Sequence, residues 1–126
     1  MTEKKIALAE QFFKATATAD RRLLNKVCDP QFTGKQNDGQ PMTLQQLADY
    51  SALVLRKVKD FRYENIVRVA TDTGFVEEHD VCCSLNHESS IRVRVCVVAN
   101  TANNRIISVR EYVDSRAAKD LIAAIS

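Results

Sequence analysis

The chain has 126 residues, of which 45% are hydrophobic and 27% are charged. This length predicts one domain over residues 1–126 with no room for separate catalytic and binding modules, and the composition excludes a disordered chain and a membrane protein. Eighteen Lys and Arg residues against sixteen Asp and Glu residues leave a net charge of +2, which gives little attraction for a polyanion, so we expect no nucleic-acid partner.

The N-terminal region predicts two helices. Apolar residues recur at helical spacing from Glu3 to about Thr18, which indicates an amphipathic helix. Asp20 is placed to cap a short second helix, and Pro30 fits a stop just beyond it. Because Glu3 and Glu10 interrupt any longer apolar run, we expect neither a signal peptide nor a membrane span, and therefore a cytoplasmic protein.

Further helices are predicted in the middle and at the end of the chain. Residues 31–42 hold two of the three glycines and predict a short strand at best, followed by a loop. Thr43 and Gln46 form a capping-box pattern at the start of a helix that runs to about Lys59. A last helix follows near the C-terminus, with Asp114 or Ser115 as its cap.

Between these helices, four segments alternate with the period of two that is typical of strands: about 61–70, 75–85, 91–99 and 105–113. These segments are joined into an antiparallel meander by short turns at 72–74 and 100–104 and by a connection at 86–90. Helices followed by such a meander predict an α+β fold, a curved antiparallel sheet wrapped by the N-terminal helices, with a short C-terminal helix. The open mouth of the resulting cone is a natural small-molecule site.

The four cysteines bear on metals and cofactors. Cys82 and Cys83 are adjacent on a predicted strand, so their side chains leave opposite faces and cannot close one tetrahedral site. No Cys-x-x-Cys spacing supports zinc, although nearby residues keep it as an alternative: His79, His87 and Cys96. We expect small reduced side chains in the core, and neither a metal nor a cofactor.

The last strand places a carboxylate on an apolar face. Ile107, Val109 and Val113 define the inner face of this strand, and Glu111 falls on the same face. Buried carboxylates are seldom tolerated unpaired, and burial raises their pKa towards the range useful for proton transfer. Glu111 is therefore a candidate catalytic residue, with a hydrogen-bonded core Glu as the alternative.

The strand at 75–85 has two possible inner faces. Hydrophobicity favours the face that carries Glu77 and His79, which would bring His79 into the cavity as a general base. The opposite face would instead bring Glu78 and Asp80 close to Glu111. Periodicity alone does not decide between these faces.

The run from Asn104 to Asp114, preceded by the apolar strand Val93-Arg94-Val95-Cys96-Val97-Val98, resembles the C-terminal signature of SnoaL-like proteins. These belong to the nuclear transport factor 2-like superfamily, whose fold is a curved sheet wrapped by helices into a conical pocket. Members include polyketide cyclases, ketosteroid isomerases, limonene-epoxide hydrolases and non-catalytic binding modules. The resemblance implies the fold more specifically than any one activity.

The resemblance also implies roles for single residues. Glu111 falls where limonene-epoxide hydrolases keep an Asp that serves as a base, and Asp80 matches their second carboxylate, which acts as an acid. Two departures stand against epoxide hydrolysis as the activity of this chain. Glu78 stands where that pattern has Arg, and residues 31–38 do not clearly supply the family's water-holding Tyr and Asn. Three clustered acids, Glu78, Asp80 and Glu111, would share protons and give an acid and a base in one pocket.

Other side chains are expected to contact the ligand. Tyr63 and Asn65 on the first strand are candidates for orienting a substrate oxygen or a water, with hydrogen bonding inside the core as the alternative. The remaining substrate-binding candidates line the wall of the cone: His79, Tyr50, Phe13, Val95 and Val109. We expect the pocket to bind a small, largely apolar, oxygen-bearing molecule, with cofactor-free isomerase, cyclase, dehydratase or hydrolase chemistry; the alternative is a non-catalytic binding or interaction module.

The predicted outer face of the sheet is rich in arginine: Arg62, Arg68, Arg92, Arg94 and Arg110. Such a patch is usually a solvated surface. It also fits a homodimer interface in which carboxylates such as Glu64 and Glu77 neutralise the charge, or an anion-binding surface. The resemblance favours a homodimer through the outer sheet face.

Overall fold

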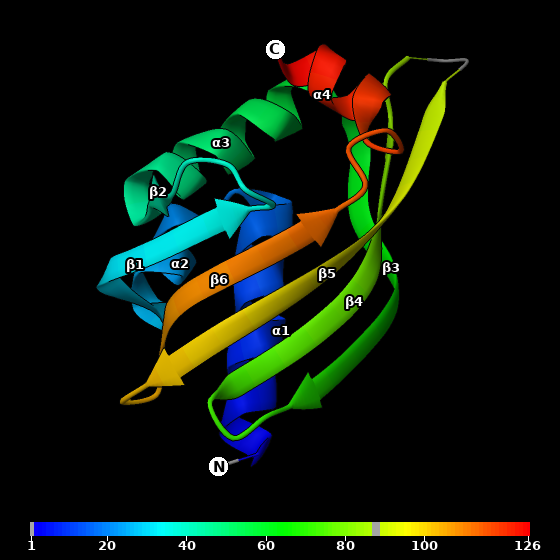
Figure 1. Cartoon of the computed structure of the whole chain (residues 1–126). Helices are drawn as coiled ribbons and strands as arrows, with labels where there is room; N and C mark the ends of the chain where they lie inside the picture. The colour runs from blue at the N-terminus through cyan, green and yellow to red at the C-terminus, as the bar shows by residue number, and fades with distance from the viewer. Residues whose placement is uncertain (1, 87–88) are drawn as a thin grey trace.

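The computed structural model describes residues 2–86 and 89–126, and its elements follow the expected order (Figure 1). The helices are α1 (Thr2–Thr18), α2 (Arg21–Val27), α3 (Leu44–Lys57) and α4 (Lys119–Ile125). The strands are β1 (Cys28–Gln36), β2 (Met42–Thr43), β3 (Lys59–Ala70), β4 (Gly74–Ser84), β5 (Ser90–Ala102) and β6 (Arg105–Val113). The α+β prediction is confirmed.

Helix capping follows the sequence signals at two of the three predicted sites. The Asp20 carboxylate accepts a hydrogen bond from the Leu23 amide at 3.0 Å, and Thr43 and Gln46 form the expected reciprocal capping box. The prediction of Asp114 or Ser115 as the cap of the last helix is wrong, because α4 begins at Lys119 after a separate turn. Asp114 stabilises that turn instead, since its carboxylate accepts from the Arg116 amide.

The strands form one open sheet in the order β2-β1-β6-β5-β4-β3. Strands β3 to β6 make the expected antiparallel meander, whereas β1 pairs in parallel with β6, so the sheet is mixed rather than purely antiparallel. The segment expected to be a short strand at best is nine residues long. Its pattern was hard to recognise because its register shifts between Cys28 and Thr33, which interrupts the alternation that marks a regular strand.

A bulge in β3 changes which residues face the core. The register against β4 shifts between Glu64 and Val67, and Asn65 has a φ of 54°. This left-handed conformation, which Asn tolerates better than most residues, inserts an extra residue and reverses the alternation beyond it. The predicted inner face is therefore correct through Tyr63 and wrong after it: Val67 and Val69 leave by the outer face and are 52% and 57% exposed.

The sheet curves around α1, which packs along its concave face, while α3 and α4 lie towards one end (Figure 1). The stripe of α1 that faces the sheet includes Phe12 and Phe13, and both rings are buried in the main core with Phe32 and Phe75. Smaller apolar clusters continue towards α3 and α4. Within the described residues, no helix has the length and apolar character needed to span a membrane.

Candidate functional site

A pocket of about 140 Å³ opens between the concave face of the sheet and the helices. An apolar cavity of roughly this size can hold a molecule such as benzene, so the enclosed part fits a small ring. Most of its wall is aliphatic or aromatic, and seven polar side chains also line it: Thr16, Gln36, Tyr50, Ser51, Tyr63, His79 and Glu111. A mainly apolar wall with a few converging polar groups is typical of a small-molecule site.

Glu111 enters this pocket from β6, between Val109 and Val113 on the same face. Its carboxylate accepts a hydrogen bond from Gln36 Nε2 at 3.1 Å. Burial raises the pKa of Glu111, and the hydrogen bond from Gln36 opposes that rise. The side chain keeps some accessible surface because it faces the cavity. A carboxyl group in this setting can hold a proton closer to neutral pH than an exposed Glu.

His79 enters the same pocket from β4 and is bound to a buried carboxylate. Its Nδ1 lies 2.6 Å from Oε2 of Glu77, whose side chain is fully buried. The other carboxylate oxygen of Glu77 accepts from Nε of Arg68, whose side chain is only 17% exposed. Arg68, Glu77 and His79 therefore form a continuous hydrogen-bonded series, here called the Arg68–Glu77–His79 chain, that ends in the pocket.

Two neighbouring aromatic rings pack against the imidazole. The ring of Tyr63 lies over His79, with centroids 4.2 Å apart and planes inclined by 38°, and Phe13 meets His79 edge to face at 5.0 Å. The Tyr63 hydroxyl is 2.8 Å from Oγ1 of Thr16, which also donates to the Phe13 carbonyl. Burial raises the pKa of Tyr63, so this phenol stays neutral and serves as a hydrogen-bonding group.

Glu111 and His79 lie on opposite sides of β5. In the register of the sheet, Val97 pairs with both Glu77 and Glu111, and Val95 pairs with His79. Neighbouring strands are about 5 Å apart, so the backbones of β4 and β6 are about 10 Å apart. A ligand lying on Val95 and Val97 would have the imidazole on one side and the carboxyl group on the other.

The prediction that Glu78, Asp80 and Glu111 share one cavity is wrong. Asp80 lies on the outer face of β4, where its carboxylate accepts from Asn65 at 2.8 Å, Arg92 at 2.9 Å and Arg94 at 3.4 Å. These hydrogen bonds, that of Asn65 first, lower the pKa of Asp80. The face that hydrophobicity favoured is the one that packs inward, because the strand buries its apolar residues with Glu77 and His79.

Glu78 and Asn65 also lie outside the pocket. The Glu78 side chain is 52% exposed, with Arg94 at 3.6 Å. Asn65 was expected on the inner face, but the bulge turns its side chain towards Asp80. The other predicted ligand contacts all line the pocket: Tyr63, His79, Tyr50, Phe13, Val95 and Val109.

Three solved structures are similar in fold to this chain over nearly its whole length. A SnoaL-like protein from Jannaschia sp. CCS1 matches with a TM-score of 0.77 at 16% identity, over 98% of this chain and 94% of that chain. An LEH-like epoxide hydrolase from M. tuberculosis matches with a TM-score of 0.72 at 16% identity, over 98% and 90%. The BvnE pinacolase from Penicillium brevicompactum matches with a TM-score of 0.80 at 12% identity, over 97% and 94%.

The chain has the SnoaL-like fold. A curved sheet wrapped by helices into a cone is the fold that the sequence resemblance implied. No family model and no curated protein sequence matches the chain. At 12–16% identity, the solved structures establish the fold and leave the activity to be argued from the residues inside the cone.

Within this SnoaL-like cone, sequence reasoning missed several residues that bear on the site, among them Gln36, Glu77 and Arg68. Glu77 could have been found, because it stands two residues before His79 and therefore shares its strand face. Arg68 was placed on the outer face, and only the bulge at Asn65 brings it to Glu77. No signal in the alternation itself marks that shift.

The structure also bears on the zinc alternative. Among residues 2–86 and 89–126, no group of three or more His, Cys, Asp or Glu side chains is arranged to hold a metal ion. His87, one of the residues considered for zinc, lies outside the described residues. Burial raises the pKa of Cys82 and Cys83, and that of Cys28 to about 12, which disfavours the thiolate form that binds metals.

Proposed function

We propose that the pocket binds a small, largely apolar, oxygen-bearing molecule and performs cofactor-free acid/base chemistry on it with Glu111 and His79. The observation that carries this proposal is the presence of both groups on the wall of one apolar pocket, on opposite sides of β5. Each group can hold or release a proton, and the apolar surroundings strengthen their interaction with a polar ligand atom. Isomerisation, cyclisation, dehydration and hydrolysis all need such a pair of proton-transfer groups.

The solved structures that share this fold add support of a general kind. One of these proteins is an epoxide hydrolase and another a pinacolase, so the same cone hosts enzymes on other sequences. The alternative, a non-catalytic binding module, predicts that the pocket carboxylates are fully paired. Glu77 fits that alternative, whereas the one hydrogen bond to the Glu111 carboxylate among the described residues comes from Gln36. The incomplete pairing of Glu111 favours a role towards a ligand.

The test begins with ligand discovery by native mass spectrometry of the purified protein and a thermal-shift screen of small ketones, epoxides and hydroxycarbonyl compounds. With a turned-over compound in hand, Glu111→Gln should lower kcat by about 100-fold or more while binding persists, since general acid/base catalysis contributes about 10²–10⁴-fold. The matched control is Glu78→Gln, because Glu78 lies on the outer face of the sheet. Unchanged turnover in Glu111→Gln would overturn the proposal.

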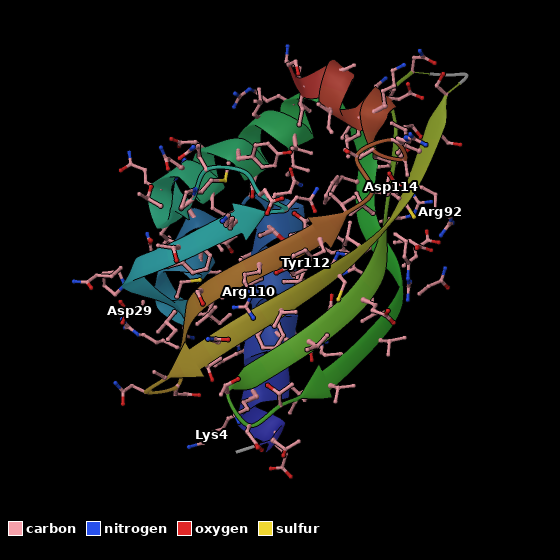
Figure 2. The ribbon with its side chains drawn as sticks, viewed as in Figure 1. Lys4, Asp29, Arg92, Arg110, Tyr112 and Asp114 are labelled. Atoms are coloured by element: carbon pink, nitrogen blue, oxygen red, sulfur yellow. The ribbon has the colours of Figure 1, made fainter. Side chains whose placement is uncertain are left out.

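We also propose a homodimer through the outer face of the sheet. Tyr112 and Arg110 project from β6 on the side away from α1 (Figure 2), and apolar side chains on this face are half exposed: Val67 52%, Val69 57% and Tyr112 48%. The arginines of this face are mostly paired within the chain, Arg92 with Glu64 and Asp80, and Arg94 with Asp80 and Glu78. This pairing leaves little free positive charge for an anion, so a second copy fits the face better.

Sedimentation of the purified chain tests this dimer. We expect a dimer that Val67→Lys converts to monomer, because a charge would then be buried without a partner. A monomeric wild-type chain at high concentration would contradict the proposal.

A further inference from the structure

The Arg68–Glu77–His79 chain determines which nitrogen of His79 faces the pocket. Resting on the proposed function of the pocket, we propose that Arg68 and Glu77 are positioning residues that hold His79 in the tautomer protonated at Nδ1. Nε2 then presents its lone pair to the cavity. His79 thereby becomes the proton acceptor of the site, and Glu111 becomes the proton donor.

The first step of the argument is the pairing of Glu77. Its side chain is fully buried, and a buried carboxylate needs a charged partner, which Arg68 supplies. The guanidinium can only donate, so it occupies one carboxylate oxygen. The other oxygen faces Nδ1 of His79 at 2.6 Å. Since a carboxylate can only accept, the hydrogen between them belongs to Nδ1.

The second step concerns Nε2. Among the described residues it has no hydrogen-bond partner, and His79 is part of the pocket wall. Phe13 and Tyr63 pack against the buried imidazole, and a ring flip that exchanged the nitrogens would also break the bond to Glu77. With Nδ1 protonated, a neutral ring leaves Nε2 as an acceptor at the cavity.

The third step assigns the opposite partner. Burial raises the pKa of Glu111, so its carboxyl group can carry the proton that the reaction delivers. A suitable ligand is neutral, with a hydroxyl or acidic C–H towards His79 and a carbonyl or ether oxygen towards Glu111. The ligand loses one proton to Nε2 and gains one from Glu111, so its atoms balance without any oxidant or reductant. His79 then returns its proton to a different atom of the intermediate and Glu111 takes its own proton back, which gives an isomer and restores both groups.

The bulge in β3 makes this arrangement possible. Without the extra residue at Asn65, Arg68 would follow the outer face of the strand and could not reach Glu77. Bulges frequently lie next to active sites, where they redirect a side chain. Here the redirected side chain neutralises the carboxylate that orients the imidazole.

The tautomer can be measured without a ligand, by long-range ¹H–¹⁵N correlation of the ring nitrogens in ¹⁵N-histidine-labelled protein. The chain has two histidines, and His87→Gln assigns their signals. We expect neutral His79 to carry its proton on Nδ1, the reverse of the preference of free histidine in water. A neutral His79 protonated at Nε2 would overturn the proposal.

Glu77→Gln sharpens the measurement. Because Arg68 can only donate, it should hold the amide oxygen of the new side chain, which turns the NH₂ group towards Nδ1. His79 should then switch to the Nε2–H tautomer. Glu78→Gln, one residue along on the outer face, is the matched control and should leave the tautomer unchanged. An unchanged tautomer in a folded Glu77→Gln variant would count against the proposal, and the wild-type measurement stands if that variant does not fold.

This test separates the tautomer from the proposed function. If His79 carries its proton on Nδ1 but His79→Gln leaves turnover unchanged, the positioning role of Glu77 holds and the catalytic role of His79 fails. If the tautomer is reversed while Glu111→Gln abolishes turnover, the acid/base pocket holds and the Arg68–Glu77–His79 chain is overturned.

Discussion

The two faces of β4 place neighbouring acids in opposite situations. Glu77, on the inner face, is fully buried and bound to Arg68 and His79, whereas Glu78, the next residue, is 52% exposed beside Arg94. Asp80 returns to the outer face and joins a network of arginines and Asn65. All three side chains are carboxylates. The inner one, Glu77, is bound to His79 in the pocket, whereas the outer ones, Glu78 and Asp80, pair with arginines on the surface. Which face a residue occupies decides its role here.

Removing Glu77 should give the largest effect on stability. Glu77→Ala leaves Arg68 and the buried His79 ring without the carboxylate, and breaking a buried ion pair costs about 3–5 kcal/mol. Glu78→Ala should change the free energy of unfolding by less than about 0.5 kcal/mol, because an exposed pair contributes little. Urea unfolding of both variants at one protein concentration measures the difference. Equal costs would show that Glu77 does not hold a buried ion pair with Arg68.

Asp80→Asn should have a smaller effect that depends on pH. The bonds from Asn65, Arg92 and Arg94 lower the pKa of Asp80 in the folded state. Its charged form therefore stabilises the fold above the ordinary Asp pKa, and this contribution is lost as pH falls through the lowered value. We expect the variant to melt below wild type at neutral pH, and the difference to shrink as the pH falls below the ordinary Asp pKa of about 3.9. A constant difference in Tm across this range would exclude ionisation of Asp80 as the cause.

The fold was more predictable from sequence than the site, for a physical reason. Helix caps such as Asp20 and the Thr43–Gln46 box act through neighbouring residues, and their side chains make the predicted bonds. The strand periods also depend on local alternation, which held through β4 and most of β5 and β6. A register shift between Asn100 and Thr101 ends it, so Ile106 lies in the core where alternation had placed Ile107. The parallel pairing of β1 with β6 joins segments far apart in sequence, and no local pattern reports it.

Hydrophobic alternation favoured the strand faces on which Glu111 and His79 lie, but it put Asn65 on the wrong face of β3. Glu111 was placed by the apolar residues around it and lies in the pocket. Asp80 was moved inward by matching it to a pattern from limonene-epoxide hydrolases, against the apolar alternation of its own strand. Alternation put Arg68 on the wrong face, since the left-handed backbone at Asn65 shifts every later residue of β3 to the other face.

Glu111→Gln should show the smallest effect on stability, with a sign opposite to that of Asp80→Asn. Burial raises the pKa of Glu111 in the folded state, so the protonated form is favoured there. Ionisation consequently weakens the fold as pH rises from the ordinary Glu pKa of about 4.3 through the raised value.

The Gln variant carries no such penalty. Its Tm should equal that of wild type in acid and exceed it at neutral pH, as differential scanning calorimetry across that range would show. A Gln variant that is less stable at neutral pH would mean that the Gln36 bond, rather than burial, controls this carboxyl group. A higher Tm of the Gln variant at neutral pH would mean that Glu111 lowers the stability of the ligand-free protein. Such a cost is expected of a residue that acts on a ligand.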